Sequence, residues 1–380
     1  MNRFSKTSNM KISRYVMITF ASVLSASILL LAGLLFIYSP GKAIPYLDEK
    51  GNHLEGSISE KVFIDIGGVR QGMFIKSKNS TNPVLLYLHG GLPEYFLTQN
   101  YPAGLEEYFT VVWWEQRGSG ISYSDDIPAE SMTLEQMISD TIEISDWLRR
   151  RFGKEKIYLM GHSGGTFIGI QAAARAPDLF YAYIGVAQIS NQLKSEFLAY
   201  EYMLNKFREK GDSKMVRKFE AAPVSLTAGI PDSYLRLRDP AMHTLGIGTT
   251  HEMNSVITGI FLPSLTCREY TLNEKINMWH GKSRSGVSIM WADILAADMS
   301  VHTPEVKIPV YFIEGVYDYT CSYTEAKLYF EKLKAPVKGF YTFNHSAHSP
   351  HYEEPEVMLK IIREDILTGG NRLSDKNIQR

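Results

Sequence analysis

A serine flanked by glycines, between an apolar run and an alanine-rich segment, restricts the fold of this chain more than any other feature. Residues 156–161 read KIYLMG, a run typical of a buried strand, and a helix is expected from residue 164. Gly161-His162-Ser163-Gly164-Gly165 joins the two and matches the pattern G-x-S-x-G. Such a turn strains the serine backbone and raises its hydroxyl above the sheet, and glycines avoid clashes on either side. The sequence therefore predicts a nucleophilic Ser163.

Further strands and helices alternate around this junction. Residues 133–153 predict a helix with Thr133 as its N-cap and Gly153 as its stop, and helices are also expected at 322–334 and 354–367. Alternating strands and helices predict an α/β fold with a mostly parallel sheet. The expected strands are 61–66, 69–75, 83–91, 109–116, 156–161, 181–189, 308–315 and 337–343.

The alternation stops in residues 191–300, which are largely helical in pattern and rich in aromatic residues. We interpret this stretch as a helical cap inserted between two parts of the α/β core, 61–190 and 301–368. Residues 39–60 read as a polar linker and residues 369–380 as a flexible polar tail.

The N-terminal residues predict a membrane anchor. Residues 15–38 carry no charge and would cover roughly 36 Å as a helix, enough for a hydrocarbon core of about 30 Å. Residues 1–14 contain four basic residues and no acid, which predicts a cytoplasmic N-terminus and an extracytoplasmic catalytic domain. The alternative is a cleaved signal peptide. Its apolar region is usually shorter, however, and FIYSPGK offers no small-x-small site.

The composition limits the classes of partner that are expected for this chain. The net charge is −1 with basic and acidic residues interspersed, so no basic face for nucleic acid is expected. The two cysteines, Cys267 and Cys321, belong to no motif. Free thiols are expected, although pairing in an oxidising compartment is an alternative.

A nucleophilic serine needs a base and an orienting acid, which follow it along the chain in the order acid, then histidine. Asp318 lies just past the strand 308–315 and is the expected acid, with Glu314 at the strand end as the rival. The segment FYTFNHSAHSPHYEEPE follows the last strand. In it His348 is the expected base and His345 the alternative.

Backbone donors should stabilise the oxyanion. We expect these to be the N–H groups of Gly164, directly after the nucleophile, and of Gly91, with Leu92 as the alternative to Gly91. The spacing H-x-x-H-x-x-H at 345–351 also allows a metal site, but no carboxylate or cysteine pattern supports one. Neither a metal nor a cofactor is expected.

The motifs LYLHGGLPE, VVWWEQRGSGIS, GHSGGT, GVYD and HSAHSPHYEEPE resemble the α/β-hydrolase superfamily, and more narrowly the prolyl iminopeptidase group of serine peptidases, over about residues 60–368. The group's His-Gly-Gly-Pro-Gly is met as His-Gly-Gly-Leu-Pro at 89–93, with the proline shifted by one position. Its Asp-Gln-Arg-Gly-x-Gly-x-Ser is met at 115–122, with Glu115 in place of aspartate. The resemblance implies a triad of Ser163, Asp318 and His348. Arg117 is expected to tie neighbouring loops together rather than to act in catalysis.

This chain departs from the group at the serine turn, where His162 and Gly164 replace the usual glycine and tryptophan. In that group, acids of the cap bind the free amine of the substrate. The resemblance makes Glu196 and Glu201 the candidates here.

These features predict a membrane-anchored serine hydrolase that acts through an acyl-enzyme. The leading substrate class is short peptides with a free N-terminus, and the alternative is a carboxylic or lipid ester. The lipid bilayer is the second expected partner. A non-catalytic binding protein on a hydrolase scaffold is a further alternative. Epoxide and haloalkane hydrolases use an aspartate nucleophile, which Ser163 argues against.

Overall fold

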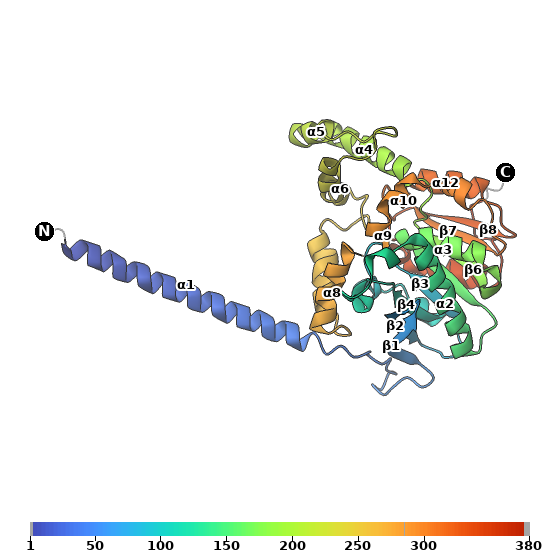
Figure 1. Cartoon of the computed structure of the whole chain (residues 1–380), viewed down its shortest axis with the longest axis horizontal. Helices are drawn as coiled ribbons and strands as arrows, with labels where there is room; N and C mark the ends of the chain where they lie inside the picture. The colour runs from blue at the N-terminus through green and yellow to red at the C-terminus, as the bar shows by residue number, and fades with distance from the viewer. Residues whose placement is uncertain (1–2, 285, 376–380) are drawn as a thin grey trace.

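The computed structural model describes residues 3–284 and 286–375 and places one long helix outside a layered α/β domain (Figure 1). The sheet of this domain has eight strands, and each predicted strand is found with its ends shifted by a few residues. The strands are β1 Ile58–Ile66, β2 Val69–Ser77, β3 Val84–Leu88, β4 Thr110–Glu115, β5 Ile157–His162, β6 Phe180–Val186, β7 Val310–Gly315 and β8 Lys338–Phe343.

The strand order β1-β2-β4-β3-β5-β6-β7-β8 makes a mostly parallel sheet, as predicted. β1 pairs with β2 and β2 with β4 in antiparallel fashion, and the other neighbours are parallel. In the pairing of β3 with β5, Leu88 lies opposite Gly161. The loop after β3 and the serine turn after β5 therefore leave the sheet at the same edge.

Apolar side chains cover both faces of the sheet. This explains why the sequences of the central strands are continuous apolar runs. Leu86 and Leu88 of β3 belong to a core cluster with residues of α2, α3 and α12. Leu85 and Tyr87 point to the other face, into a second cluster with residues of α14. Alternate residues of one strand are thus buried on opposite sides.

The helices begin and end at the signals that the sequence carries. Thr133 caps α2 by accepting the N–H of Gln136, and Gly153 ends it in the left-handed conformation. The α-helices are α1 Arg3–Ile37, α2 Leu134–Phe152, α3 Gly164–Arg175, α4 Gln192–Glu209, α5 Ser213–Glu220, α6 Asp232–Thr244, α7 Leu262–Thr266, α8 Leu272–Lys282, α9 Gly286–Ile289, α10 Trp291–Ala296, α11 Met299–His302, α12 Tyr323–Lys332, α13 Pro350–Glu353 and α14 Pro355–Ile361. Two π-helical turns, Ile257–Phe261 and Ile362–Ile366, precede α7 and follow α14.

The segment expected as one cap, 191–300, packs as several pieces. Residues of α4, α5 and α6 form a cluster of their own. Met290 and Ile294 instead join the core under α3, and Tyr270 and Met278 join the core on the other face of the sheet. Cys267 and Cys321 are free, buried thiols, as expected.

α1 contains the expected apolar span, over Tyr15–Ile37. Its mean hydropathy is 2.5, and none of it is buried against the rest of the chain. By length and composition it could cross a membrane, and a signal sequence near an N-terminus passes the same test.

The polar C-terminal residues were predicted as a free tail, but they pair with the edge of the sheet as far as Asp375. The N–H of Asp375 donates to Phe340, and the Asn371 amide donates to the carbonyl of Lys338. Residues 376–380 of the predicted tail lie outside the described residues.

Candidate active site

Ser163 occupies a strained turn between β5 and α3, with φ 53° and ψ −123°. Its glycine neighbours leave no space for side chains. A Cβ on Gly165 would lie 2.1 Å from the backbone oxygen of Leu88, and a Cβ on Gly161 would lie 2.6 Å from the oxygen of Gly165. Ser163 lines a cavity of about 740 Å³ at the carboxyl edge of the sheet. The turn thus presents the serine to a space large enough for a small substrate.

Asp318 and His348 are joined by a hydrogen bond. Asp318 follows β7, and its Oδ1 accepts the N–H groups of Thr320 and Cys321 at 2.7 and 2.9 Å. Its Oδ2 accepts from Nδ1 of His348 at 2.9 Å. Asp318 is fully buried, and His348 lines the same cavity as Ser163. The carboxylate therefore fixes the tautomer that leaves Nε2 of His348 available to accept a proton.

The two rival residues lie elsewhere. His345 is exposed, and its backbone N–H donates to Glu354. Glu314 is buried within β7, where its Oε1 accepts the N–H of Gln188. Burial raises the pKa of Glu314 well above its usual range, which favours the protonated, neutral form of this carboxyl.

The loop after β3 approaches the serine closely at Gly90. A Cβ there would lie 2.8 Å from Cβ of Ser163. The N–H of Gly90 donates to Glu94 at 3.2 Å. No hydrogen bond among the described residues engages the N–H of Gly91 or of Gly164, so both expected oxyanion donors are available.

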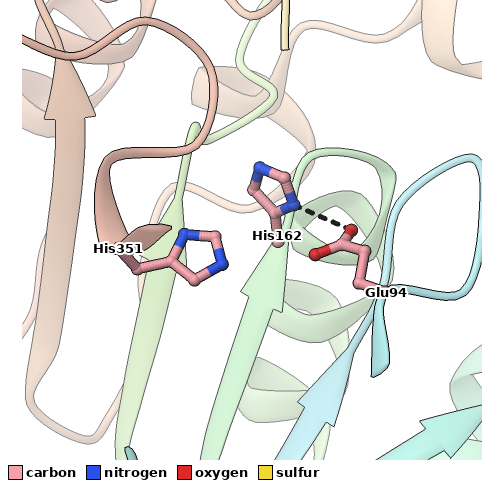
Figure 2. A group of neighbouring side chains, drawn as sticks. All are labelled: Glu94, His162 and His351. Carbon is pink, nitrogen blue, oxygen red and sulfur yellow. Dashed lines mark hydrogen bonds and ion pairs between the residues drawn. The ribbon is translucent and has the colours of Figure 1, made fainter. Parts of the chain in front are cut away.

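A buried cluster beside the serine joins Glu94, His162 and His351 (Figure 2), and the sequence did not reveal it. Nδ1 of His162 donates to Glu94 at 2.8 Å, and its Nε2 donates to the carbonyl of His348 at 2.7 Å. The Tyr87 hydroxyl donates to the other oxygen of Glu94 and lies 3.0 Å from Nε2 of His351. The cluster thus links the loop after β3, the serine turn and the histidine loop.

The ionisation of this cluster follows from its contacts. Burial alone raises the pKa of Glu94, but the charge and hydrogen bond of His162, with contributions from His351 and Tyr87, lower it to about 2. Burial lowers the pKa of His162, yet the charge and hydrogen bond of Glu94 raise it overall. Burial drives the pKa of His351 well below its usual range. The lowered pKa of Glu94 and the raised pKa of His162 favour an ion pair between them, and the lowered pKa of His351 favours its neutral form.

The same three side chains are of types that bind metal ions, with donor atoms within 4.8 Å of one another. Their geometry favours a proton instead. Both ring nitrogens of His162 face oxygen acceptors at hydrogen-bond distance, so both carry protons. Nδ1 then has no lone pair to give to a metal.

Gln116 and Arg117 hold the neighbouring loops, as expected. The Gln116 amide donates to the carbonyl of His89 at 2.9 Å. Arg117 donates to both oxygens of Asp140 and to the carbonyl of Gly67. The bidentate pair is buried and away from the cavity, which fits a structural role.

A family model described as the alpha/beta hydrolase fold matches residues 83–355, well over half of the chain. The chain belongs to the α/β-hydrolase family. The probable aminopeptidase YbaC of Bacillus subtilis (strain 168) is 34% identical to it over 299 residues, which cover 77% of this chain and 92% of the relative.

Solved structures share the fold of this α/β-hydrolase. A proline iminopeptidase-related protein from Thermus thermophilus superimposes with a TM-score of 0.57 at 19% identity, over 82% of this chain and 98% of that one. Proline iminopeptidase from Mycobacterium smegmatis gives 0.56 at 14% identity, over 81% and 98%. At such identities the likeness concerns the fold.

The cap acids expected to bind an amine do not line the cavity of this α/β-hydrolase. Glu196 is fully buried, where it accepts from Nε of Arg238 at 2.7 Å and from the Tyr234 hydroxyl at 3.1 Å. Glu201 lies exposed on α4. The cap instead places Asp239 on the cavity wall. Asp239 directly follows Arg238 in α6. The packing of α6 on α4 places it on the cavity wall, and the sequence pattern alone does not indicate this.

Proposed function

We propose that this α/β-hydrolase is a serine hydrolase that removes N-terminal residues from short peptides through an acyl-enzyme. One observation carries the proposal: Asp318 holds His348 by a 2.9 Å hydrogen bond at the cavity into which Ser163 is raised. The aminopeptidase relative and the iminopeptidase structures support a peptide substrate.

In this mechanism the Ser163 oxygen attacks the carbonyl carbon of the substrate and gives its proton to Nε2 of His348. The N–H groups of Gly91 and Gly164 stabilise the oxyanion. His348 then passes the proton to the leaving amine as the C–N bond breaks. Water, deprotonated by His348, attacks the acyl-enzyme, and the proton returns to Ser163 as the acid product leaves.

A free N-terminal amine needs an anionic partner in the cavity, where two carboxylates lie on the wall. Glu94 is already engaged by His162, Gly90 and Tyr87. The Asp239 side chain is 59% exposed, and its Oδ1 accepts from Arg238 at 2.8 Å, while no hydrogen bond among the described residues engages its Oδ2. Partial removal of solvent by the surrounding wall raises its pKa, but the charge and hydrogen bond of Arg238 outweigh this and lower the pKa, so the carboxylate is ionised at neutral pH. We assign amine binding to Asp239.

A fluorophosphonate probe tests the nucleophile. Wild-type protein should be labelled at Ser163, and Ser163→Ala should not. Labelling that persists in Ser163→Ala would show that another residue is the nucleophile. In His348→Ala, labelling of Ser163 should be far slower than in wild type. In the control His345→Ala, labelling should proceed at the wild-type rate. The reverse result would move the base to His345.

An ester hydrolase is the second candidate, favoured by the apolar part of the cavity wall, which includes Ile257, Phe261 and Trp279. Three substrates separate the two activities: a prolyl arylamide with a free amine, its N-acylated form and a short p-nitrophenyl ester. The peptidase proposal predicts turnover of the free amine well above the N-acylated form. Turnover of the ester alone would refute it.

We also propose that α1 is retained and holds the catalytic domain on the outer side of a membrane. Its uncharged span and the four basic residues before it support this orientation. Full-length protein that alkaline carbonate releases from membranes, or a mature chain that begins after residue 38, would refute the anchor.

A further inference from the structure

A patch of exposed apolar side chains covers the outer surface of residues 257–276. Leu272 and Ile276 of α8 follow one another at helical spacing, and Trp279 continues the same stripe. The ring of Trp279 lies 5.3 Å from that of Phe261, and its indole N–H donates to Ser264. These contacts join α8 to α7 and to the π-helical turn before it. We define the cap patch as Ile257, Phe261, Leu262, Leu272 and Ile276, all between 38% and 61% exposed.

The cap patch lies beside the end of α1. The ammonium group of Lys275 donates to the carbonyl of Tyr38, to the hydroxyl of Ser39 and to the carbonyl of Leu265, at the end of α7. The N–H of Gly41 donates to the carbonyl of Arg268 at 3.1 Å. α1 ends at Ile37, so Lys275 bonds α8 directly to the point where the chain leaves its apolar helix, and it also bonds α7. α8 lies beside this end of α1 in Figure 1.

This contact determines where the cap patch lies if α1 spans a bilayer. Tyr38 then sits at the membrane surface, and side chains fixed to its carbonyl cannot be far from that surface. Lys42 and Arg268 are exposed on the bonded segments. Exposed apolar residues flanked by basic ones are typical of a surface that rests on anionic lipid.

The cavity wall includes part of the cap patch. Ile257 and Phe261 belong both to the cap patch and to the cavity wall, and Val256, Ile260 and Trp279 continue that wall. A molecule with an apolar chain in the bilayer surface would therefore meet apolar side chains from the lipid to the region of Ser163.

We propose that the cap patch rests in the surface of the bilayer that holds α1, and that, beside the short peptides of the proposed function, the cavity takes amphiphilic esters with an apolar chain from that surface. The first half of the proposal, that the cap patch docks on the bilayer, depends on the proposal that α1 is retained as a membrane anchor. The substrate half also rests on the proposed hydrolase function.

Lipid-quenched fluorescence tests the docking half. Full-length protein is placed in vesicles of phosphatidylcholine and phosphatidylglycerol, with an NBD label on Leu262→Cys or on Leu328→Cys as the control. The two leucines are equally exposed, at 45% and 44%, and α12, which carries Leu328, lies on the other side of the domain from α1 (Figure 1). Burial raises the pKa of both native thiols, so they should react slowly with the label.

Doxyl-labelled lipids should quench the probe at position 262 and leave the probe at 328 unquenched. Equal, weak quenching at both positions would overturn the proposal. So would a blue-shifted emission at 262 that lipids do not quench, because a second copy of the chain or another protein would then cover the cap patch.

Kinetics test the substrate half. Leu262→Asp and Ile276→Asp alter the cap patch without touching the cavity wall, and Leu328→Asp is the control. Both patch variants should raise the KM of a long-chain ester in vesicles by roughly tenfold, since a charge replaces an apolar contact with lipid. The kinetics of a short, soluble ester should be unchanged.

The outcomes separate the two halves from each other and from the proposed function. Absence of fluorophosphonate labelling at Ser163 would refute the hydrolase function and leave the quenching result standing. Quenching at 262 together with unchanged long-chain kinetics in both patch variants would refute substrate entry from the bilayer. Substrate entry from the bilayer would also be refuted if the patch variants lost activity equally toward the long-chain ester and the short, soluble ester.

Discussion

Replacing Glu94 with glutamine removes the negative charge from a buried ion pair while keeping the shape of the side chain. The carboxylate accepts hydrogen bonds from His162 at 2.8 Å and from Gly90 at 3.2 Å, and it is 8% exposed. In the folded protein its pKa is about 2, against an ordinary value of 4.5. That difference corresponds to about 3 kcal/mol of stability at pH 7, similar to the cost of breaking other buried pairs.

The pH dependence of this contribution has a definite sign. A carboxylate whose folded pKa is lowered stabilises the protein above its ordinary pKa, and the contribution is lost as pH falls toward the folded value. About 1 kcal/mol should be lost by pH 4 and about 2 kcal/mol by pH 3. The raised pKa of His162 has the opposite effect. Its contribution to stability is fully present below pH 6.5, the ordinary pKa of histidine, and is lost as the pH rises through the pKa of His162 in the folded protein.

Urea unfolding of full-length protein in detergent, followed by tryptophan fluorescence at pH 7, 5 and 4, measures the effect. Glu94→Gln should lower the free energy of unfolding at pH 7, and the gap to wild type should narrow at pH 4. The control is Glu135→Gln, which removes an exposed partner of Arg175 and should change little. A loss below about 1 kcal/mol at pH 7, or a gap that does not narrow with acid, would refute the assigned ion pair.

Other residues of the site give shorter tests. Asp318→Asn should lower kcat by about 10⁴ with KM nearly unchanged, because His348 would no longer be held in the active tautomer, and steady-state kinetics within tenfold of wild type would contradict this. Gly165→Ala places a Cβ against the Leu88 carbonyl and should cost more than about 4 kcal/mol in thermal unfolding, whereas Gly91→Ala meets no atom within 4 Å and should fold normally. Asp239→Asn should raise KM for a free-amine arylamide at least about tenfold and leave that of its N-acylated form unchanged, and equal effects on both would exclude amine binding.

Local pattern in the sequence accounts for most of the fold. Strands such as β3 and β7 are buried on both faces, so their continuous apolar runs are visible without any knowledge of their neighbours. The ends of α2 depend on Thr133 and Gly153, whose effects act within one helical turn. The cap was less predictable, because its short helices pack against three separate clusters that local periodicity does not distinguish.

The sequence also named the candidate nucleophile, acid and base. Ser163 carries a local backbone signature, and Asp318 and His348 follow strand ends in a fixed order along the chain. Choosing His348 over His345 is a different matter, because only the path of the loop after β8 decides which ring meets Asp318.

What the sequence determined by itself is therefore short in range: the apolar span, the strands, the helix ends and the strained serine turn, each caused by residues a few positions apart. Only the tertiary structure decided that Glu94 and His162, 68 positions apart, form a buried ion pair, and that Glu196 is occupied by Arg238. It also placed Lys275 on the carbonyl of Tyr38, which brings the cap patch to the anchor. These contacts depend on the order of strands in the sheet and on the packing of the cap, which bring distant residues together and which no local pattern records.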